Sequence, residues 1–235
     1  MRLAIMQPYL FPYIGYFQLM NAVDEFVIYD NIQFTKKGWI NRNRILVNGK
    51  DDYISLPLKK DSDYLNVDER FLADAWVSEK KKMLNKIRST YQKSPNFNVI
   101  FSLIEKIILF EENNLFSFLL NSIKLINEYL GIQTLITVSS TINIDHTLKS
   151  EKKVIEICKA KRTKVYINPV GGVDLYDTNI FKDQGIDLFF LKTNSITYPQ
   201  FNHEFVPWLS IIDVLMFNPK EEIKEMLNSY TFLQL

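Results

Sequence analysis

The chain has 235 residues, and its 28 lysines and arginines nearly balance its 27 aspartates and glutamates, for a formal net charge of +1. This length allows one large α/β domain, or a domain with an insert, and the small net charge excludes a global field that recruits nucleic acid or an anionic membrane. The single cysteine, Cys158, and the lack of any uncharged stretch near the roughly 18 to 20 residues of a spanning helix predict a cytoplasmic protein without a disulfide or membrane insertion.

The first part of the chain predicts a βαβ unit followed by a β-hairpin. Apolar runs at 2–6 and 25–30 are typical of buried strands, and the helical spacing of apolar residues between 13 and 22 predicts a helix between them. Two β-rich runs then flank Asn48-Gly49, a pair that favours the left-handed turn of a hairpin. We expect a projecting two-stranded arm there.

The middle of the chain is predicted to be helical. Between residues 73 and 130 there is no glycine, Pro95 is the only proline, and apolar residues recur every three or four positions. We expect three helices, near 76–91, 95–111 and 114–130.

The α/β pattern then resumes. Strands are expected at 134–139, 164–168 and 187–192, and helices near 150–160, 208–217 and 219–229. The order of half-sheet, helical block and half-sheet favours a Rossmann-like α/β fold with a mainly parallel sheet, helices on both faces and an all-helical insert. The corresponding division is 1–72 for the first half with its hairpin, 73–131 for the insert and 132–235 for the second half.

The stretch QPYLFPYIGY, residues 7–16, follows the first strand, where doubly wound sheets bind their ligands. Its polar side chains are Gln7, Tyr9, Tyr13 and Tyr16. The spacing YIGY places two tyrosines where the histidines of the HIGH-type signature stand in nucleotidylyl transferases, adenylate-forming ligases and class I tRNA synthetases. The alternative is that these tyrosines only pack the first helix onto the sheet.

A densely polar segment follows the second strand. It contains Asp30, Gln33, Lys37, Asn41, Arg42, Asn43 and Arg44. Asp30 ends a strand beside the first loop, where a carboxylate can hold a ribose, a metal ion or an attacking amine. Arginine forks suit phosphate oxygens, and on an extended strand Arg42 and Arg44 face one side while Asn41 and Asn43 face the other. The alternative is an exposed arm with a solvated charged face.

Small and polar residues follow the later strands. Ser139 ends one strand, and Asn168, Gly171 and Gly172 lie at the end of the next, so all four are expected at the same edge of the sheet as candidate ligand contacts. His146, in the loop before a helix, is a candidate base or an ordinary surface residue.

Three further polar residues lie near the end of the chain. Tyr198 and Gln200 are candidate substrate contacts. Asp213 lies in an apolar helix, where a carboxylate needs a partner, so it is either a hydrogen-bond hub or a support for the site. Two histidines and one distant cysteine give no zinc spacing, so we expect no metal site.

Five segments of the chain resemble the WbqC-like family. They are QPYLFPYIGYFQLM, DEFVIYDNIQFTKKGWINRNRI, YISLPL, YPQF and FVPWLSIIDVLMFN, in that order, and the resemblance runs from Leu3 to about Asn218. The chain departs from the family pattern at Met6, where many relatives carry a histidine, and at NPVGGVDLY, where a Ser-Gly followed by a glycine-rich turn and Tyr-Leu is common. A mechanism that needs that histidine is therefore not supported for this chain.

The resemblance implies a role in bacterial surface polysaccharides, especially O-antigens with acylated amino sugars. The expected function is a transferase that forms an amide on the amino group of a nucleotide-linked amino sugar by aminoacyl transfer, such as glycyl transfer. Its other ligand would be an amino acid or an activated acyl donor, with ATP as a candidate co-substrate and a carrier or tRNA donor left open. No cofactor is expected to be tightly bound, and a homodimer is left open.

The sequence also offers residues for the chemistry and a rival to it. Asp30, Gln7, Tyr13 and His146 are the candidate catalytic residues. The rival is a non-catalytic nucleotide-sugar-binding or assembly protein, which is favoured by the lack of a recognisable acid–base pair.

Overall fold

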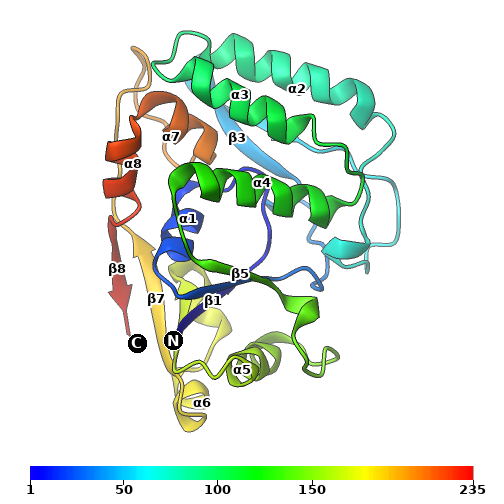
Figure 1. The fold of residues 1–235 in the computed structure, drawn as a ribbon, viewed down its shortest axis with the longest axis vertical. Helices are drawn as coiled ribbons and strands as arrows, with labels where there is room; N and C mark the ends of the chain where they lie inside the picture. Colours follow the sequence, from blue (N-terminus) through cyan, green and yellow to red (C-terminus); the bar gives the residue numbers. More distant parts are fainter. Residues whose placement is uncertain (235) are drawn as a thin grey trace.

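The computed structural model describes residues 1–234 and has an α/β fold around a mostly parallel sheet (Figure 1). The strands of this sheet are β1 (Arg2–Met6), β2 (Glu25–Ile28), β5 (Leu135–Val138), β6 (Val165–Pro169), β7 (Asp187–Thr193) and β8 (Tyr230–Leu233). Their spatial order is β5-β2-β1-β6-β7-β8, and only the β7–β8 pair is antiparallel. With the hairpin strands left out, this is the order 3-2-1-4-5-6 of a doubly wound sheet.

Helices cover both faces of the sheet, as the sequence predicts. Alternate residues of β1 point to opposite faces, so Leu3 and Ile5 join one hydrophobic cluster and Ala4 joins the other. The cluster around Ala4 is covered by α1 (Ile14–Asn21), α4 (Leu115–Leu130), α7 (Ile211–Phe217) and α8 (Lys220–Met226). The cluster around Leu3 is covered by α5 (Ser150–Ala160) and α6 (Thr178–Asp183), which lie at the bottom of Figure 1.

The three helices predicted in the middle of the chain are present. They are α2 (Trp76–Tyr91), α3 (Phe97–Ile108) and α4. The Asn114 side chain accepts a hydrogen bond from the Ser117 amide at the start of α4, and Gly131 ends this helix with φ 75°. Buried residues of all three helices belong to the same cluster as Ala4, so the block packs directly on the α/β core.

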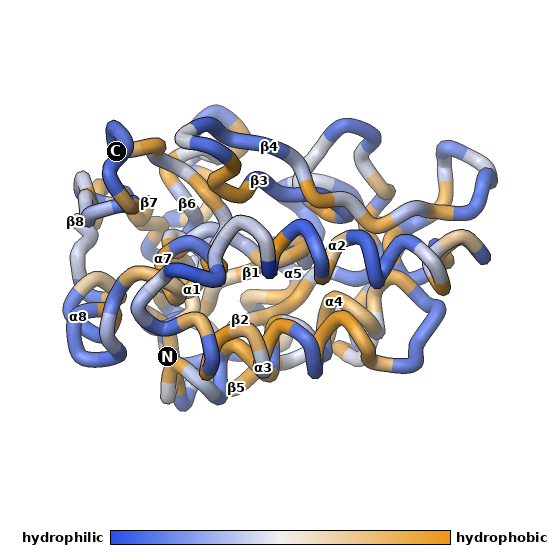
Figure 2. The backbone as a smooth tube through the Cα atoms, turned by 90° about the horizontal axis from the view of Figure 1, so that it is seen from above, coloured by the Kyte–Doolittle hydropathy of each residue, from blue (hydrophilic) through white to orange (hydrophobic). Residues whose placement is uncertain are grey.

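The hairpin forms as predicted, with β3 (Arg42–Val47) and β4 (Lys50–Ser55) joined at Asn48 and Gly49, both at positive φ. We expected this hairpin to project into solvent, but it packs on the rest of the protein. Ile45 is buried, and the backbone amide of Leu46 donates a hydrogen bond to the hydroxyl of Tyr91 in α2. Figure 2 shows hydrophobic segments concentrated in the sheet and the helices beside it, whereas β4 and the outer loops are mostly hydrophilic.

Several short elements were not predicted. They are β8, α6 and the 3-10 turns η1 (Val67–Glu69), η2 (Ser139–Thr141) and η3 (Val170–Leu175). The predicted helix at 219–229 ends earlier, at Met226, because the chain then turns to form β8 beside β7. None of the helices in residues 1–234 is long and apolar enough to cross a membrane.

Candidate functional site

A pocket of about 210 Å³ lies beside the loop that follows β1. Its walls come from three distant parts of the chain: the first loop, the start of β3 with the residue Trp39 before it, and the loop that precedes α7. The lining residues are Tyr9, Pro12, Tyr13, Trp39, Asn43, Arg44 and Trp208. Tyr13 is the N-cap of α1, so the pocket lies at the carboxyl side of the sheet, where doubly wound folds bind ligands.

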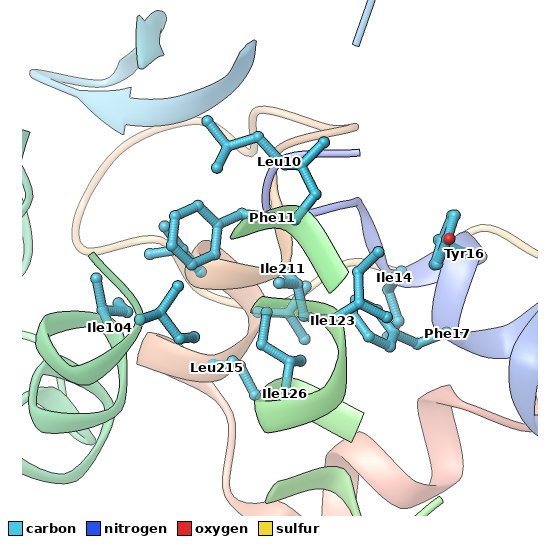
Figure 3. Close-up of a cluster of buried hydrophobic side chains, with 14 of the residues drawn as sticks. Leu10, Phe11, Ile14, Tyr16, Phe17, Ile104, Ile123, Ile126, Ile211 and Leu215 are labelled. Carbon is cyan, nitrogen blue, oxygen red and sulfur yellow. The ribbon is translucent and has the colours of Figure 1, made fainter. Parts of the chain in front are cut away.

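The first loop turns sharply because two of its apolar residues enter the core. Leu10 and Phe11 are fully buried in the cluster that includes Ile123 and Ile211 (Figure 3). Phe11 has φ 42°, a strained conformation for a bulky residue. The side-chain amide of Asn43 donates to the carbonyl oxygens of Leu10 and Phe11 at 3.0 and 2.8 Å. Asn43 therefore holds the turn in this shape.

The ring of Tyr13 lies over the first turn of α1. A Cβ atom added at Gly15 would come within 2.3 Å of the Tyr13 ring, so only glycine leaves room for the ring in this position. On its other side the ring centroid is 6.1 Å from that of Trp208. Trp208 itself has φ 62° and is 62% exposed, which makes it a large apolar surface open to a ligand.

Arg44 is the one permanent charge in the pocket lining. Its Nη1 lies 3.1 Å from Oδ2 of Asp51, and its Nη2 donates to the backbone carbonyl of Trp208 at 3.2 Å. Its guanidinium carbon lies 5.4 Å from the ring centroid of Trp39, and Nε is enclosed without an acceptor. The guanidinium group is thus fixed in orientation while it keeps an unused donor.

The tyrosines of the first loop divide between the two roles considered for them. Tyr9 lines the pocket, and burial raises the pKa of its phenol to about 12, with a smaller contribution from Tyr13. This phenol therefore stays protonated at neutral pH. Tyr16 instead packs on the sheet, with its ring centroid 5.2 Å from that of Phe26.

Asp30 belongs to a separate polar cluster at the ends of β2 and β5. Its Oδ1 accepts hydrogen bonds from the Ser139 hydroxyl at 2.7 Å and the Ser140 amide at 2.9 Å. The side-chain amide nitrogen of the next residue, Asn31, lies 2.9 Å from Nδ1 of His146. Nε2 of His146 lies 2.9 Å from the carbonyl oxygen of Ile142. The side-chain N–H of Asn31 donates to Nδ1 and Nε2 donates to the carbonyl, so both nitrogens of His146 are already used.

Lys153 completes this cluster, and sequence reasoning missed it. It is buried in α5 and donates to the backbone and side-chain oxygens of Asn31, each at 3.1 Å. Burial lowers the pKa of its ammonium group, and the nearby carboxylates of Asp30 and Asp68 oppose that shift. Little in the sequence indicated that Lys153 is buried, because it follows two other charged residues, Glu151 and Lys152, in a segment typical of an exposed helix surface.

The remaining predicted residues lie outside the pocket lining. Arg42 shares a face of β3 with Arg44, but it donates to the carbonyls of Lys37 and Gly38, and Asn41 donates to the carbonyl of Leu56. Gln33 is exposed and donates to the Asp63 carbonyl, Lys37 is exposed, and Gln7 is half-buried at the end of β1.

Tyr198 and Gln200 are occupied by a structural contact. Both donate to Oδ2 of Asp213, at 2.7 and 2.6 Å, while Tyr91 donates to its Oδ1 at 2.8 Å. Asp213 is therefore the hydrogen-bond hub that was one of the two alternatives for it.

The glycine pair after β6 makes a close contact within the chain. A Cβ atom at Gly172 would lie 2.1 Å from the side-chain amide of Asn168, whereas Gly171 is exposed and has open space around it. Asn168 is itself buried and accepts a hydrogen bond from Tyr166.

The comparisons with known proteins identify the family. The WbqC-like protein family matches residues 7–225. The chain belongs to this family. It is also similar to the uncharacterized protein Rv1507c of Mycobacterium tuberculosis, with 29% identity over 96% of this chain and 97% of that protein. No solved structure matches the chain.

In this WbqC-like protein, the whole pocket lining falls inside the matched range. The sequence predicted Tyr9, Tyr13, Asn43 and Arg44 as site residues, but it did not single out Trp39 and Trp208. Both tryptophans lie within the segments that carry the family resemblance, GWIN and VPWLS.

Proposed function

We propose that this WbqC-like protein is a transferase that forms an amide on the amino group of a nucleotide-linked amino sugar. The transferred group would be an aminoacyl group such as glycyl, in the synthesis of a surface polysaccharide. The observation that carries this proposal is the pocket of aromatic rings around Arg44 at the carboxyl side of the sheet. Aromatic faces stack on planar bases and on the apolar faces of sugars, and arginine pairs with phosphate oxygens.

The size of the pocket supports a ligand that is only partly enclosed. A volume of about 210 Å³ is below the roughly 300 to 1,000 Å³ of sites for drug-sized ligands, so the pocket accommodates one ring of a sugar nucleotide. The rest would lie along the hairpin. There Trp39 and Tyr53 are 41% and 45% exposed and stack with ring centroids 6.3 Å apart, and the guanidinium group of Arg42 lies 4.9 Å from the Tyr53 centroid.

The chemical step proposed for this site is acyl transfer. The neutral form of the sugar amine, which has given one proton to water, attacks the carbonyl carbon of an activated acyl donor, such as an acyl adenylate made with ATP. The C–N bond forms, the bond to the leaving group breaks, and the leaving group departs with that electron pair. The nitrogen then releases a second proton to water, which leaves a neutral amide. Positioning two reactants in a near-attack geometry can lower the barrier by roughly 7 to 11 kcal/mol, so the step does not require a general base in the pocket.

A second candidate function is a non-catalytic nucleotide-sugar-binding protein. The observation that favours it is the chemistry of the lining, which contains no carboxylate and no imidazole. The predicted catalytic candidates Asp30 and His146 lie in the other cluster, and their polar atoms contact Ser139, Asn31 and Ile142.

One experiment separates the two functions. The purified protein is incubated with ATP, glycine and a panel of nucleotide-linked amino sugars, and the products are analysed by mass spectrometry. A sugar nucleotide that gains one glycyl group supports the transferase. The incubation is repeated with glycyl-tRNA as the donor. If calorimetry shows that a sugar nucleotide binds, but neither donor gives a glycylated product, the result supports the binding protein. Absence of binding by every member of the panel contradicts both.

A matched pair of variants tests the location of the site. Trp39→Ala removes one stacking face, and stacking of a base on an aromatic ring contributes about 1 to 3 kcal/mol, so affinity is expected to fall about fivefold to 150-fold. Tyr64→Ala removes an exposed aromatic ring outside the pocket and is expected to leave affinity unchanged.

A further inference from the structure

Arg70 is a buried arginine without a counterion. It follows η1 directly and is 4% exposed. Its Nε and Nη2 atoms are enclosed and have no acceptor, and Arg70 forms no ion pair within residues 1–234. Its guanidinium carbon lies over the ring of Phe34, 4.9 Å from the ring centroid. A ring face attracts the charge but does not satisfy the two enclosed N–H groups.

The backbone on both sides of Arg70 is fixed to the carboxyl edge of the sheet. The amide of Val67 donates to the carbonyl of Ile32, and the amide of Asp68 donates to that of Asp30, so η1 lies over the residues that follow β2. The carbonyl of Arg70 accepts a hydrogen bond from Leu115, at the start of α4. The backbone that carries the Arg70 side chain is therefore fixed before any ligand arrives.

The two unused nitrogens are the pair that recognises a planar anion. Nε and the Nη on its side form parallel donors that match the two oxygens of a carboxylate or a phosphate. Asp68, two residues earlier, has its Oδ1 enclosed without a donor as well. The same turn thus has unused donors and an unused acceptor that do not satisfy each other, which a native structure retains only for a reason such as ligand binding.

We propose that Arg70 binds an anionic group of a ligand, a carboxylate or a phosphate, at the carboxyl edge of the sheet. Arg70 is not part of the aromatic pocket lining, so this site does not depend on the proposed transferase function. Because both nitrogens are enclosed, neighbouring side chains must move to admit the anion. Once bound, the anion would be largely shielded from water, which strengthens its pairing with the guanidinium group.

The test measures the melting temperature of the full chain with four probes at constant ionic strength: inorganic phosphate, pyrophosphate, acetate and glycine. At least one probe is expected to raise the melting temperature of the wild type. If only phosphate or pyrophosphate raises the melting temperature, the site binds a phosphate group. If only acetate or glycine raises it, the site binds a carboxylate. Absence of a shift with all four overturns the proposal, whatever the variants do.

Three variants locate the effect. Arg70→Met keeps most of the side-chain volume and is expected to weaken binding of the active probe at least tenfold. It should also melt no lower than the wild type without anion, because it removes an unpaired buried charge. Arg70→Lys, which keeps the charge but loses the fork, is expected to bind several-fold more weakly, and it replaces Arg70→Met if that variant does not fold.

Arg88→Met is the matched control, since the guanidinium carbon of Arg88 also lies over a ring, 4.4 Å from the Phe101 centroid, but its side chain is 53% exposed. It is expected to keep the full response to the anion. An unchanged response in the Arg70 variants would overturn the proposal. Trp39→Ala should also respond normally, so failure of the aromatic pocket can be told apart from failure of this site.

Discussion

Gly15 links the shape of the first loop to the proposed pocket. An alanine methyl group there would overlap the end of the Tyr13 ring, which is a movable side chain and not backbone. Alanine is also favoured over glycine in a helix by about 1 kcal/mol, so the helix itself tolerates the change. The contact therefore acts on the position of the ring more than on the stability of the fold.

Gly15→Ala is expected to lower the affinity for a sugar nucleotide about tenfold while the melting temperature stays the same or rises. Calorimetric titration and thermal unfolding of the same preparation would check this. Unchanged affinity in a folded Gly15→Ala protein would mean that the Tyr13 ring position does not matter for binding.

Arg44 is the residue that the proposal assigns to phosphate. A charge-assisted hydrogen bond contributes roughly 1.5 to 3 kcal/mol, so Arg44→Ala is expected to weaken binding about tenfold to a hundredfold. Arg44→Lys should recover only part of this, because lysine lacks the planar fork. Arg2→Ala is the control, since Arg2 pairs with Asp24 at the amino end of β1 and is not part of the pocket lining. Equal losses in both alanine variants would contradict the special place given to Arg44.

At the scale of elements, Tyr91 and Asp213 join parts of the chain that carry the pocket. The Tyr91 hydroxyl accepts from the Leu46 amide in β3 and donates to Asp213 in α7, which also accepts from Tyr198. Helix α2, the hairpin, α7 and the loop at 198–206 are thus connected through two side chains that are buried in the core.

Tyr91→Phe tests this hub. The change leaves a buried amide without its acceptor and a buried carboxylate without one donor, and each such loss costs about 1 to 3 kcal/mol. The free energy of unfolding, measured with urea, is therefore expected to fall by about 2 to 4 kcal/mol. Tyr129→Phe, on a partly exposed tyrosine of α4, should change it by less than about 0.5 kcal/mol. A loss as small as this for Tyr91→Phe would show that the hub contributes little to stability.

Elements with a strong apolar period were predictable from the sequence, and weakly patterned ones were not. The parallel strands are apolar runs because both of their faces are covered, and the middle helices repeat apolar residues every three or four positions. Strand β8 lacks such a signal, because it is an edge strand whose two central residues are exposed. Its place depends on pairing with β7, which lies far away in the sequence.

The candidate site was predictable in its location and only partly in its members. Tyr13 was predicted because it lies in the loop after the first strand. Arg44 was predicted because it lies in the densely polar segment after the second strand. Asp30 was expected beside them, but its carboxylate turns toward Ser139 and Ser140 at the end of β5. Which of two adjacent strand ends a side chain faces is decided by tertiary contacts that a single sequence does not contain.

At the scale of the whole molecule, the end of the chain closes the fold against its beginning. Gln18 in α1 is fully buried, and its amide nitrogen donates to the carbonyls of Met226 and Ser229 at 2.7 and 3.0 Å. After Ser229 the chain forms β8 and covers the edge of β7. The centroids of the Phe232 and Phe189 rings lie 6.2 Å apart across these two strands.

A chain that stops after Ser229 is expected to associate as well as to lose stability. Without β8, the backbone donors and acceptors of β7 that now pair with it become an open sheet edge, a template for pairing with a second chain. We expect a lower melting temperature and a sedimentation coefficient that rises with protein concentration. A control that lacks only residues 234–235 keeps β8 and should sediment as the full chain does. If the shortened chain melts earlier without associating, β8 contributes packing but does not protect the edge. If neither property changes, the contacts of Gln18 alone are enough to close the fold.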